Sequence, residues 1–343
     1  MTPQELAGKK VAVLYTSVEE SLAGVADAKM RESMDLAVSA RLVADALGRS
    51  GVAAQYFAFG RDIVALAGSI RSFGADAVFN LSECPLNSAQ KEAHGAAFLE
   101  LLRIPYTGNG PSPLTVCNNK ALTKRILASH GIATPAFRLY SGVPRGRSGL
   151  SFPVIVKPAR EDGSAGITEE SVVEDEAGLK KRVALVIERY NQEALAEEYV
   201  GGREFNVAVL GNGTSEDSYR AFPPAELIYR NHKWRVCSFE SKWDPAHPAF
   251  SEIAPVCPAD VNEASRRRLA AITVECARIF GLCGYSRVDF RSNRNGKLFV
   301  LEVNPNPDIS PDAGLARAGR AEGLSYDALI LAILRLGLAR GAR

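Results

Sequence analysis

The chain has 343 residues, of which 46% are hydrophobic and 23% are charged, and its formal net charge is +2. This length predicts two or three domains, and the composition is ordinary for a soluble globular protein. The near-neutral charge argues against a nucleic-acid partner, because nucleic-acid binding needs a strongly basic face.

No segment predicts export or membrane insertion. The N-terminal residues are polar, and the longest apolar stretch, 328–339, is interrupted by Arg335 and is too short to span a bilayer. We therefore expect a cytoplasmic protein with no membrane partner, in which 328–339 forms a buried helix. The six cysteines include no C-x-x-C pair, so reduced thiols are expected, with Cys84 in a loop that could line a site.

The first third of the chain alternates between short apolar runs and helical patterns. Strands are expected at 11–15, 53–58 and 75–81, and helices at 34–47, 63–73 and 89–102. This alternation predicts an α/β fold with a parallel sheet that has helices on both faces. Because ligands bind beyond the carboxyl ends of such strands, the loops after Tyr15 and Asn80 are candidate walls of a site.

The middle of the chain begins with a turn cluster at 107–113, a predicted boundary. A strand ends at Lys157, and a loop of small residues follows at 161–166, here called the glycine loop. The last part has a mixed pattern and ends in a predicted β-hairpin. Further elements are expected at 119–129 (helix), 141–151 (mobile connection), 152–157 (strand), 176–188 (helix), 194–199 (strand), 204–210 (strand), 211–218 (turn), 261–280 (helix), and 284–290 and 298–303 (strands of the hairpin, turn 293–296).

Three oxygen-bearing side chains are expected to converge on this hairpin. Glu302 and Asn304 alternate along one strand and therefore point to one face, and strand pairing can bring Asp289 opposite that face. Two carboxylates and an amide are hard oxygen ligands suited to Mg²⁺ held with phosphates. The same spacing fits solvated surface side chains, but the apolar flanks of both strands favour a metal site, because unpaired charges there are costly.

Three cationic residues are candidates for the same site. Arg287 lies two residues before Asp289, where it could neutralise a developing oxyanion or simply pair with Glu302. Lys157 faces the glycine loop, whose small residues would let backbone N–H groups approach phosphate oxygens, although the loop is not a Walker A motif. Lys120 opens a helix, where it could also be exposed to solvent.

Taken in chain order, these segments resemble the ATP-grasp superfamily, and within it the D-alanine–D-alanine ligase-like family. The resemblance rests on LELLRIPYTG at 99–108, NK at 119–120, FPVIVKP at 152–158, EFNVAVL at 204–210, RVD at 287–289 and LEVNP at 301–305. It implies an α/β and α+β ATP-grasp fold with an N-terminal domain at 1–112, a lid domain at 113–200 and a central/C-terminal domain at 201–343. ATP would lie between the last two domains.

The resemblance also implies roles for individual residues. It implies ATP and Mg²⁺ as cofactors, with two metal ions bridged by Glu302 and with Mn²⁺ able to substitute. The implied roles are phosphate binding by Lys120 and Lys157, loop closure over the phosphates by Gly163, Ser164 and Gly166, adenine contact at Glu197, Tyr199 and Val200, ribose binding by Glu204, contact with the terminal phosphate by Lys242, metal binding by Asp289, Glu302 and Asn304, and oxyanion stabilisation by Arg287.

The family chemistry joins a carboxylic acid to an amine. A carboxylate attacks the γ-phosphate to give an acyl phosphate, from which the lid excludes water, and an amine then attacks the activated carbonyl. We therefore expect small amino-acid or carboxylic-acid substrates and, from the resemblance, a homodimer.

The chain departs from the family at substrate positions. Gly163 and Ala313 stand where the D-alanine ligases have serines, and Trp243 replaces a tyrosine. We therefore expect amino-acid-like substrates other than two D-alanines, because deleting a donor weakens recognition of a substrate carboxylate. A genuine D-alanine–D-alanine ligase, a phosphotransferase and a non-catalytic nucleotide-binding protein are the alternatives. Candidates that could read the new substrate, or else be surface or capping residues, are Glu83, His94, Trp243, Asp308 and Asp312.

Overall fold

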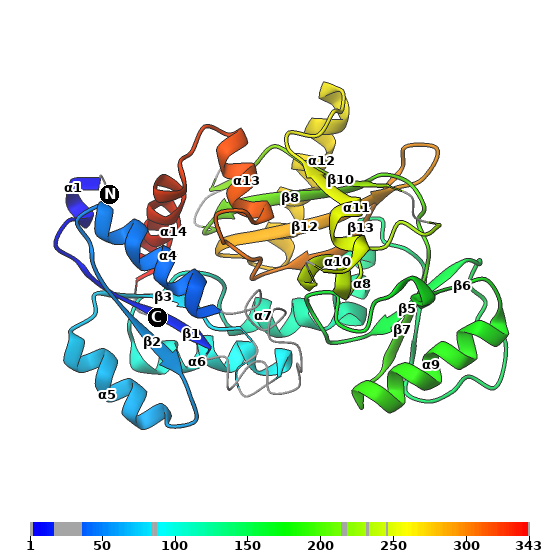
Figure 1. The fold of residues 1–343 in the computed structure, drawn as a ribbon, viewed down its shortest axis with the longest axis horizontal. Helices are drawn as coiled ribbons and strands as arrows, with labels where there is room; N and C mark the ends of the chain where they lie inside the picture. Colours follow the sequence, from blue (N-terminus) through cyan, green and yellow to red (C-terminus); the bar gives the residue numbers. More distant parts are fainter. Residues whose placement is uncertain are drawn as a thin grey trace.

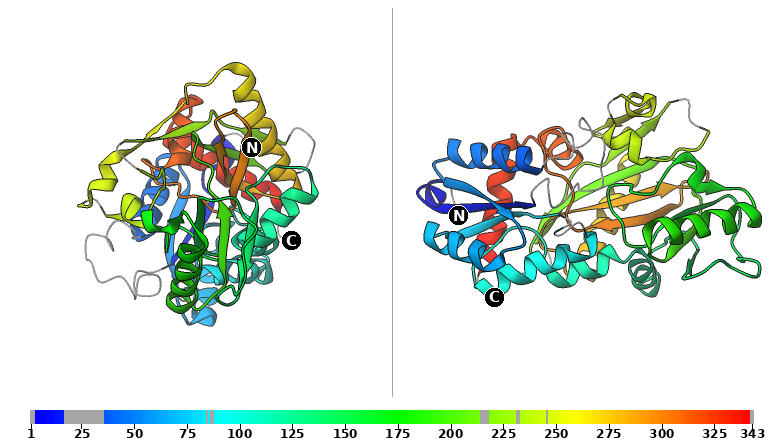
Figure 2. Two further views of the ribbon diagram at one scale, coloured as in Figure 1. Left: turned by 90° about the vertical axis from the view of Figure 1, so that its right-hand side faces the viewer. Right: turned by 60° about the horizontal axis from the view of Figure 1, so that its bottom comes forward.

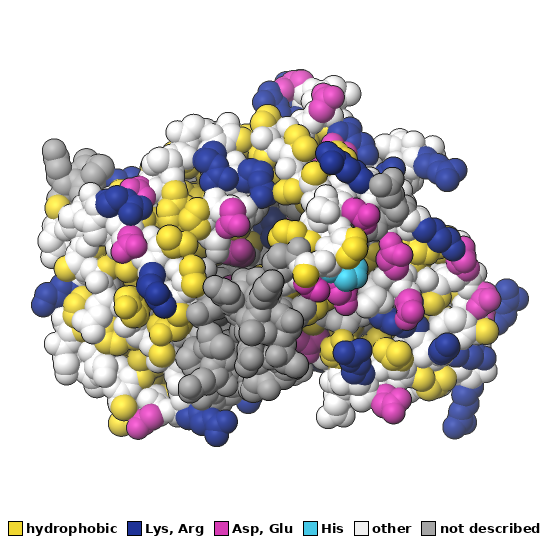
Figure 3. All heavy atoms as spheres, viewed as in Figure 1, with side chains coloured by type: hydrophobic (Ala, Val, Ile, Leu, Met, Phe, Trp, Pro, Cys, Tyr) yellow, Lys and Arg dark blue, Asp and Glu magenta, His cyan; other side chains and the backbone are white. Residues whose placement is uncertain are grey.

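The computed structural model describes residues 3–16, 36–83, 85, 88–213, 218–230, 233–244 and 246–341. Three β-sheets follow one another along the chain, and the first and second lie at opposite ends of the molecule with the third between them (Figure 1). On the face shown in Figure 3, basic and acidic side chains are interspersed. Two expectations, the loop directly after Tyr15 and the thiol of Cys84, lie outside the described residues.

The first sheet confirms the predicted parallel α/β unit. Strand β1 (Lys10–Thr16) lies between β2 (Ala53–Phe59) and β3 (Ala77–Leu81), and all three strands are parallel. Residues 11–14 of β1 are fully buried because helices cover both faces of the sheet. The helices of this unit are α1 (Pro3–Leu6), α4 (Leu36–Arg49), α5 (Ile63–Phe73), η2 (Ala89–Lys91) and α6 (Glu92–Leu102).

Two helices connect the first sheet to the second. The predicted turn at 107–113 is only partly correct, because α7 (Pro111–Asn118) already begins at Pro111, a residue that is favoured in the first turn of a helix. The next helix, α8 (Lys120–Ser129), begins where the side chain of Asn119 accepts a hydrogen bond of 3.1 Å from the backbone N–H of Leu122. This cap places Lys120 in the first turn of α8.

The second sheet is antiparallel and has helix α9 (Glu176–Tyr190) packed on one face. Its strand order is β4 (Phe137–Tyr140), β7 (Ala194–Glu198), β5 (Val154–Pro158) and β6 (Val172–Val173). Apolar side chains at every third or fourth position of α9 pack on β5 and β7, as an amphipathic helix requires. The sequence patterns predicted β5, β7 and α9, but not the short strands β4 and β6 or the 3₁₀ turn η3 (Glu169–Ser171).

The third sheet has six strands and contains the predicted hairpin. Strand β8 (Glu204–Gly211) pairs with β12 (Gly284–Ser292), which pairs with β13 (Leu298–Asn304). Helix α12 (Glu263–Ile279) covers one face. Elements that the patterns did not predict are β9 (Tyr219–Ala221), β10 (Ala225–Tyr229), β11 (Ile253–Val256), α10 (Phe239–Trp243), α11 (Pro248–Glu252) and α13 (Gly314–Ala321).

The C-terminal helix α14 (Tyr326–Arg340) is buried, as predicted, but it packs against the first sheet as well as the third. Its residues Leu329, Ile330, Ile333 and Leu334 belong to the same apolar core as strands β1 and β3. Figure 2 shows α14, in red, beside the blue N-terminal unit. None of the helices in the described ranges is long and apolar enough to cross a membrane.

Candidate active site

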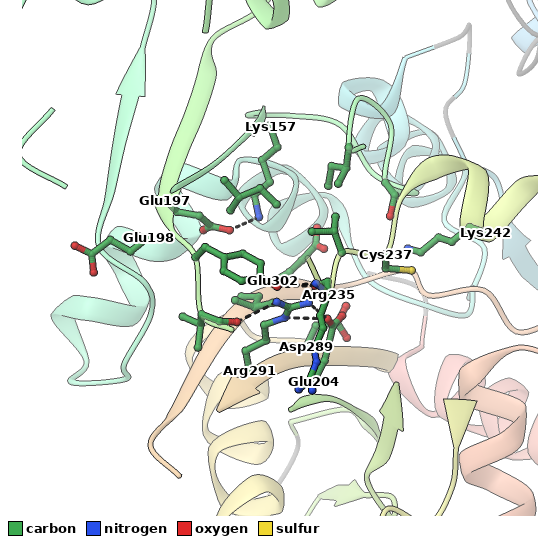
Figure 4. Close-up of a pocket in the computed structure, with 17 residues that line it drawn as sticks. Lys157, Glu197, Glu198, Glu204, Arg235, Cys237, Lys242, Asp289, Arg291 and Glu302 are labelled. Carbon is green, nitrogen blue, oxygen red and sulfur yellow. Dashed lines mark hydrogen bonds and ion pairs between the residues drawn. The ribbon is translucent and has the colours of Figure 1, made fainter. Parts of the chain in front are cut away.

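A cleft lies between the second and third sheets (Figure 4). It contains about 680 Å³ of empty space, part of it open to solvent. Its walls include nine residues singled out from the sequence: Lys157, Ser164, Glu197, Tyr199, Val200, Glu204, Lys242, Asp289 and Glu302. The other eight lining residues are Ile155, Ile167, Glu198, Arg235, Val236, Cys237, Arg291 and Leu301.

The register of the hairpin brings the expected metal ligands onto one face. Asp289 lies directly opposite Glu302, and Arg287 lies directly opposite Asn304. Residues that lie opposite each other in an antiparallel pair share a face of the sheet. Val288 and Phe290 point the other way, into the core beneath α12. The hairpin therefore presents two carboxylates, an amide and a guanidinium together.

The guanidinium of Arg287 forms a bidentate ion pair with the carboxylate of Asp289. Its Nε lies 2.7 Å from Oδ1 and its Nη2 lies 2.9 Å from Oδ2, while Asn206 Nδ2 donates to Oδ1 over 2.8 Å. The expected alternative, a pairing of Arg287 with Glu302, is therefore wrong. Burial alone would lower the pKa of Arg287, but Asp289 outweighs it and raises the pKa, so the guanidinium stays charged.

Glu302 pairs instead with Lys120. The Nζ of Lys120 lies 2.7 Å from Glu302 Oε1 and 3.3 Å from Asp162 Oδ1, and it donates to the carbonyl oxygen of Glu161 over 2.6 Å. Only 6% of Lys120 is exposed, so the solvent-exposed alternative is wrong. Burial would raise the pKa of Glu302, but Lys120 and Lys157 lower it far below the usual range. Glu302 is therefore an anion available to a metal ion.

The carboxylate of Glu197 lies between two lysines. Its Oε1 is 2.6 Å from Lys157 Nζ, and its Oε2 is 2.7 Å from Lys124 Nζ. The ion pair with Lys157 is drawn as a dashed line in Figure 4. Burial would raise the pKa of Glu197, but the two lysines lower it to about 2. Lys124 was not singled out from the sequence. Its spacing of four from Lys120 on a helix was the available signal, because such residues share a face.

The glycine loop bends through left-handed backbone at three positions. The φ angles are 61° at Gly163, 64° at Ser164 and 74° at Gly166. Arg182 of α9 donates to the carbonyl of Gly166 over 3.0 Å, and the indole N–H of Trp243 donates to the carbonyl of Gly163 over 2.9 Å. The loop is therefore anchored at one end by α9 and contacts α10 at the other.

At the far end of the cleft, Glu204 is held by Arg291 and Tyr229. Arg291 Nε lies 2.9 Å from Glu204 Oε2, and Tyr229 donates to the same oxygen over 2.7 Å. Arg291 also donates to the carbonyl of Val200 over 3.0 Å and lies over the ring of Tyr199. The sequence pattern missed Arg291, although it follows Arg287 and Asp289 at alternate positions on β12.

The remaining predicted residues lie at the edges of the cleft or away from it. Lys242, on α10, lines the cleft opposite Lys157 (Figure 4). Asn304 lies on the hairpin face, and its side-chain oxygen accepts from the backbone N–H of Asn306 over 2.8 Å. Asp308 is exposed and caps a turn by accepting from Ser310, as its alternative role implied. Outside the cleft walls, Asp312 and His94 are exposed.

Glu83 lies in a group of acidic residues beside the first sheet. Burial, Glu92 and Asp308 all raise the pKa of Glu83. Glu92 is itself buried and accepts a hydrogen bond from Asn306, and burial together with Asp162 raises its pKa to about 8. This group lies outside the cleft walls.

The donor set of the hairpin fits a magnesium ion. Asp289, Glu302 and Asn304 offer oxygen atoms only, as Mg²⁺ prefers. In the part of the chain that the structure describes, no three His, Cys, Asp or Glu side chains cluster as a metal site. Two carboxylates would therefore depend on the amide and on substrate phosphates to complete the shell around the ion.

Comparisons with known proteins show which family this chain resembles. The sequence model of the family described as D-ala D-ala ligase C-terminus matches residues 143–335. An uncharacterised protein of Sinorhizobium fredii, y4sG, is 33% identical over 75% of this chain and 73% of its own length. The D-alanine–D-alanine ligase of Bordetella pertussis is 34% identical over 69% of this chain and 71% of its own length.

A solved structure shows the same fold. The D-alanine–D-alanine ligase of Bacillus anthracis, complexed with ATP, superimposes with a TM-score of 0.74 at 17% sequence identity. The match covers 97% of this chain and 98% of that one. The arrangement of the three sheets is therefore shared with that structure.

Proposed function

Because this chain belongs to the D-alanine–D-alanine ligase family of ATP-grasp enzymes, it is an ATP-dependent ligase that forms carbon–nitrogen bonds, and we propose that it joins a carboxylate to an amine through an acyl phosphate. The observation that carries the proposal is the hairpin register. It sets Asp289 against Glu302 on the face that also bears Arg287. Lys157 and Lys242 line the same cleft.

The first step that we propose is phosphoryl transfer. A substrate carboxylate oxygen attacks the γ-phosphorus of ATP, the bond to the ADP oxygen breaks, and an acyl phosphate forms. Lys157, Lys120 and Lys242 would offset the negative charge on the transferring group. Asp289, Glu302 and Asn304 would hold Mg²⁺, which would supply charge neutralisation and Lewis acidity when bound.

The second step is attack of the amine on the activated carbonyl. A tetrahedral oxyanion forms, inorganic phosphate leaves with the carbon–oxygen bond electrons, and the amine loses a proton. Arg287 would stabilise the oxyanion, because its guanidinium is permanently charged and fixed by Asp289. The contact of Trp243 with the glycine loop supports a role for α10 in excluding water from the acyl phosphate.

We propose that the two substrates are not both D-alanine. Gly163 has no side chain with which to read a substrate, and its carbonyl is already occupied by the indole N–H of Trp243. Ala313, at the start of α13, offers no hydroxyl. The alternative, D-alanine–D-alanine ligation, is favoured by the names of curated relatives that are 30–34% identical.

A screen for ATP-dependent phosphate release tests both the ligase reaction and the choice of substrates. Pairs of amino and carboxylic acids, D-alanine with itself among them, would be supplied with ATP and Mg²⁺, and products identified by mass spectrometry. We expect phosphate release and a condensed product with a pair other than two D-alanines, and neither with the Lys157→Ala variant. Efficient D-alanyl-D-alanine formation would reject the substrate proposal and keep the ligase. Phosphorylation without an amine would indicate a phosphotransferase.

A further inference from the structure

Three buried charges form a chain that leads out of the cleft. Lys157 and Glu197 line the cleft, and Lys124 lies behind them on α8, where no part of its side chain is exposed. The Nζ of Lys124 is 2.7 Å from Glu197 Oε2 and 2.8 Å from Thr134 Oγ1. Helix α8 packs on the second sheet through Ala121, so Lys124 is held in place by the fold.

Lys157 alone could not present a net positive charge to a phosphate. Its ammonium lies 2.6 Å from Glu197 Oε1, and a carboxylate at that distance cancels one positive charge. Lys124 occupies the other oxygen of the same carboxylate. Burial and Lys157 lower the pKa of Lys124, and the ion pair with Glu197 opposes that shift. With both lysines protonated, the three groups together sum to one positive charge, and burial leaves that charge poorly screened by solvent ions.

We infer that Lys124 is a positioning residue for nucleotide binding, because by neutralising Glu197 it leaves the positive charge of Lys157 free to attract the phosphates. Lys124 itself lies outside the cleft walls and acts through the other two groups. The low pKa of Glu197 is consistent with a carboxylate that stays charged between two cations. The inference rests on the proposed function, since it takes the cleft to be the nucleotide site.

A purely structural role for Lys124 makes a different prediction. If Lys124 only stabilised the packing of α8 on the sheet, replacing it would disturb the whole cleft and weaken the binding of adenosine, ADP and ATP to the same extent. If Lys124 supplies charge, removing it should weaken binding more strongly as the number of phosphates on the ligand increases, because Coulomb attraction scales with ligand charge. Adenosine, ADP and ATP therefore form the decisive series.

The experiment compares Lys124→Met with the wild type by calorimetric titration of each ligand in the presence of Mg²⁺. We expect adenosine to bind within about twofold of the wild type, and ATP to bind about tenfold more weakly or worse. Lys181→Met removes one charge from the exposed face of α9 and serves as the matched control, with ATP binding unchanged. An equal loss for adenosine and ATP, or no loss for ATP, would overturn the inference.

A double variant provides a charge-restoring test. Lys124→Met with Glu197→Gln leaves Lys157 as the one charge of the three, so the sum returns to one positive charge. Because Glu197 could also contact adenine, the measure is the ratio of the ATP and adenosine dissociation constants, which should return to within about threefold of the wild-type ratio. The double variant also decides the matter if Lys124→Met does not fold, since a tenfold change of that ratio in a folded double variant would contradict the inference. If wild-type protein binds no ATP, the proposed function fails instead.

Discussion

At the scale of single residues, four carboxylates at the cleft each face an internal cation. A buried charge is costly unless it is paired, so these pairs let the charges that we propose for catalysis remain in a folded interior. On ligand binding, a charged side chain would exchange its internal ion-pair partner for a charged group of the ligand, so no unpaired charge would have to be buried. The pairs are Asp289 with Arg287, Glu302 with Lys120, Glu197 with Lys157 and Lys124, and Glu204 with Arg291.

Asp289→Asn tests the metal role of the hairpin. The substitution keeps the shape of the side chain but removes the charge that would hold Mg²⁺, so phosphate release should fall by about 100-fold or more. A titration of Mg²⁺ should show a higher requirement in the variant. Asp260→Asn, at an exposed position, is the control and should behave as wild type. Full activity of Asp289→Asn would exclude this carboxylate as a metal ligand.

Glu92→Gln tests the buried carboxyl beside the first sheet. The ordinary pKa of the group is 4.5, and in the fold it rises to about 8. Between these values the folded state binds a proton that the unfolded state releases, so the stability of the wild type falls as pH rises through that window. The variant should match the wild type near pH 4.5 and have a higher Tm above pH 8.

Thermal unfolding from pH 4.5 to 9 measures this difference. Glu188→Gln, at an exposed position on α9, should change Tm by a similar small amount at every pH. A Tm difference for Glu92→Gln that stays constant with pH would show that Glu92 is ionised in the fold throughout.

At the scale of elements, strand β12 connects the core with the site. Its alternation sends Val288 and Phe290 into the core and Arg287, Asp289 and Arg291 to the cleft side. Across from it, Glu204 of β8 lies opposite Arg291. One strand therefore supplies groups at both the hairpin end and the far end of the cleft.

The glycine loop offers a direct test of substrate choice. In Gly163→Ser, the new Cβ would lie 3.6 Å from the Trp243 ring nitrogen, so it fits, while the left-handed backbone costs about 1 kcal/mol. The added hydroxyl should raise use of D-alanine by about threefold to tenfold over Gly163→Ala, the value of one hydrogen bond. Steady-state rates with D-alanine measure it. Equal rates for the two variants would remove position 163 from substrate recognition.

Gly202→Ala tests the crossover from β7 to β8. A Cβ there would lie 1.9 Å from the carbonyl oxygen of Ser292, at the end of β12. Because that oxygen belongs to the backbone, the strands must separate, and the free energy of unfolding should fall by about 2–3 kcal/mol. Gly142→Ala, with open space around its Cβ, is the matched control for urea unfolding. A free energy of unfolding equal to that of the control would show that the backbone at the crossover can shift to accept a Cβ at little cost.

At the scale of the whole molecule, the C-terminal helix packs against the N-terminal unit. Helix α14 follows the third sheet but shares an apolar core with β1 and β3. The N-terminal unit is therefore stabilised by the C-terminus. We propose that 1–112, 113–200 and 201–343 act as three domains, each of which contains one sheet, with α14 joining the last to the first.

Gly337→Ala tests this junction. A Cβ on Gly337 would lie 2.9 Å from the carbonyl oxygen of Tyr106 and 3.0 Å from the backbone N of Thr107, so α14 must shift and stability should fall by about 1–3 kcal/mol. Gly48→Ala, in α4 with open space around it, should instead stabilise by about 0.5–1 kcal/mol. Urea unfolding should show changes of opposite sign in the free energy of unfolding for the two variants. Stabilisation by both would mean that α14 does not pack tightly on the N-terminal unit.

The sequence by itself determined the features that depend on local periodicity. Alternation and helical spacing predicted the first sheet, the hairpin, α9, α12 and α14, because burial of one face imposes those periods. The shared face of Glu302 and Asn304 also followed from strand alternation. Short elements such as β9 and α10 were missed, because a few residues carry too little pattern to outweigh chance.

Only the tertiary structure decided which charges are partners. Nothing local to Arg287 distinguishes Asp289 from Glu302 as its partner, and nothing local to Lys120 distinguishes burial from exposure. Lys124 and Glu197 become neighbours because α8 packs against the second sheet. Ion pairing depends on distances between segments that are remote in the chain, and those distances are set when the cores close.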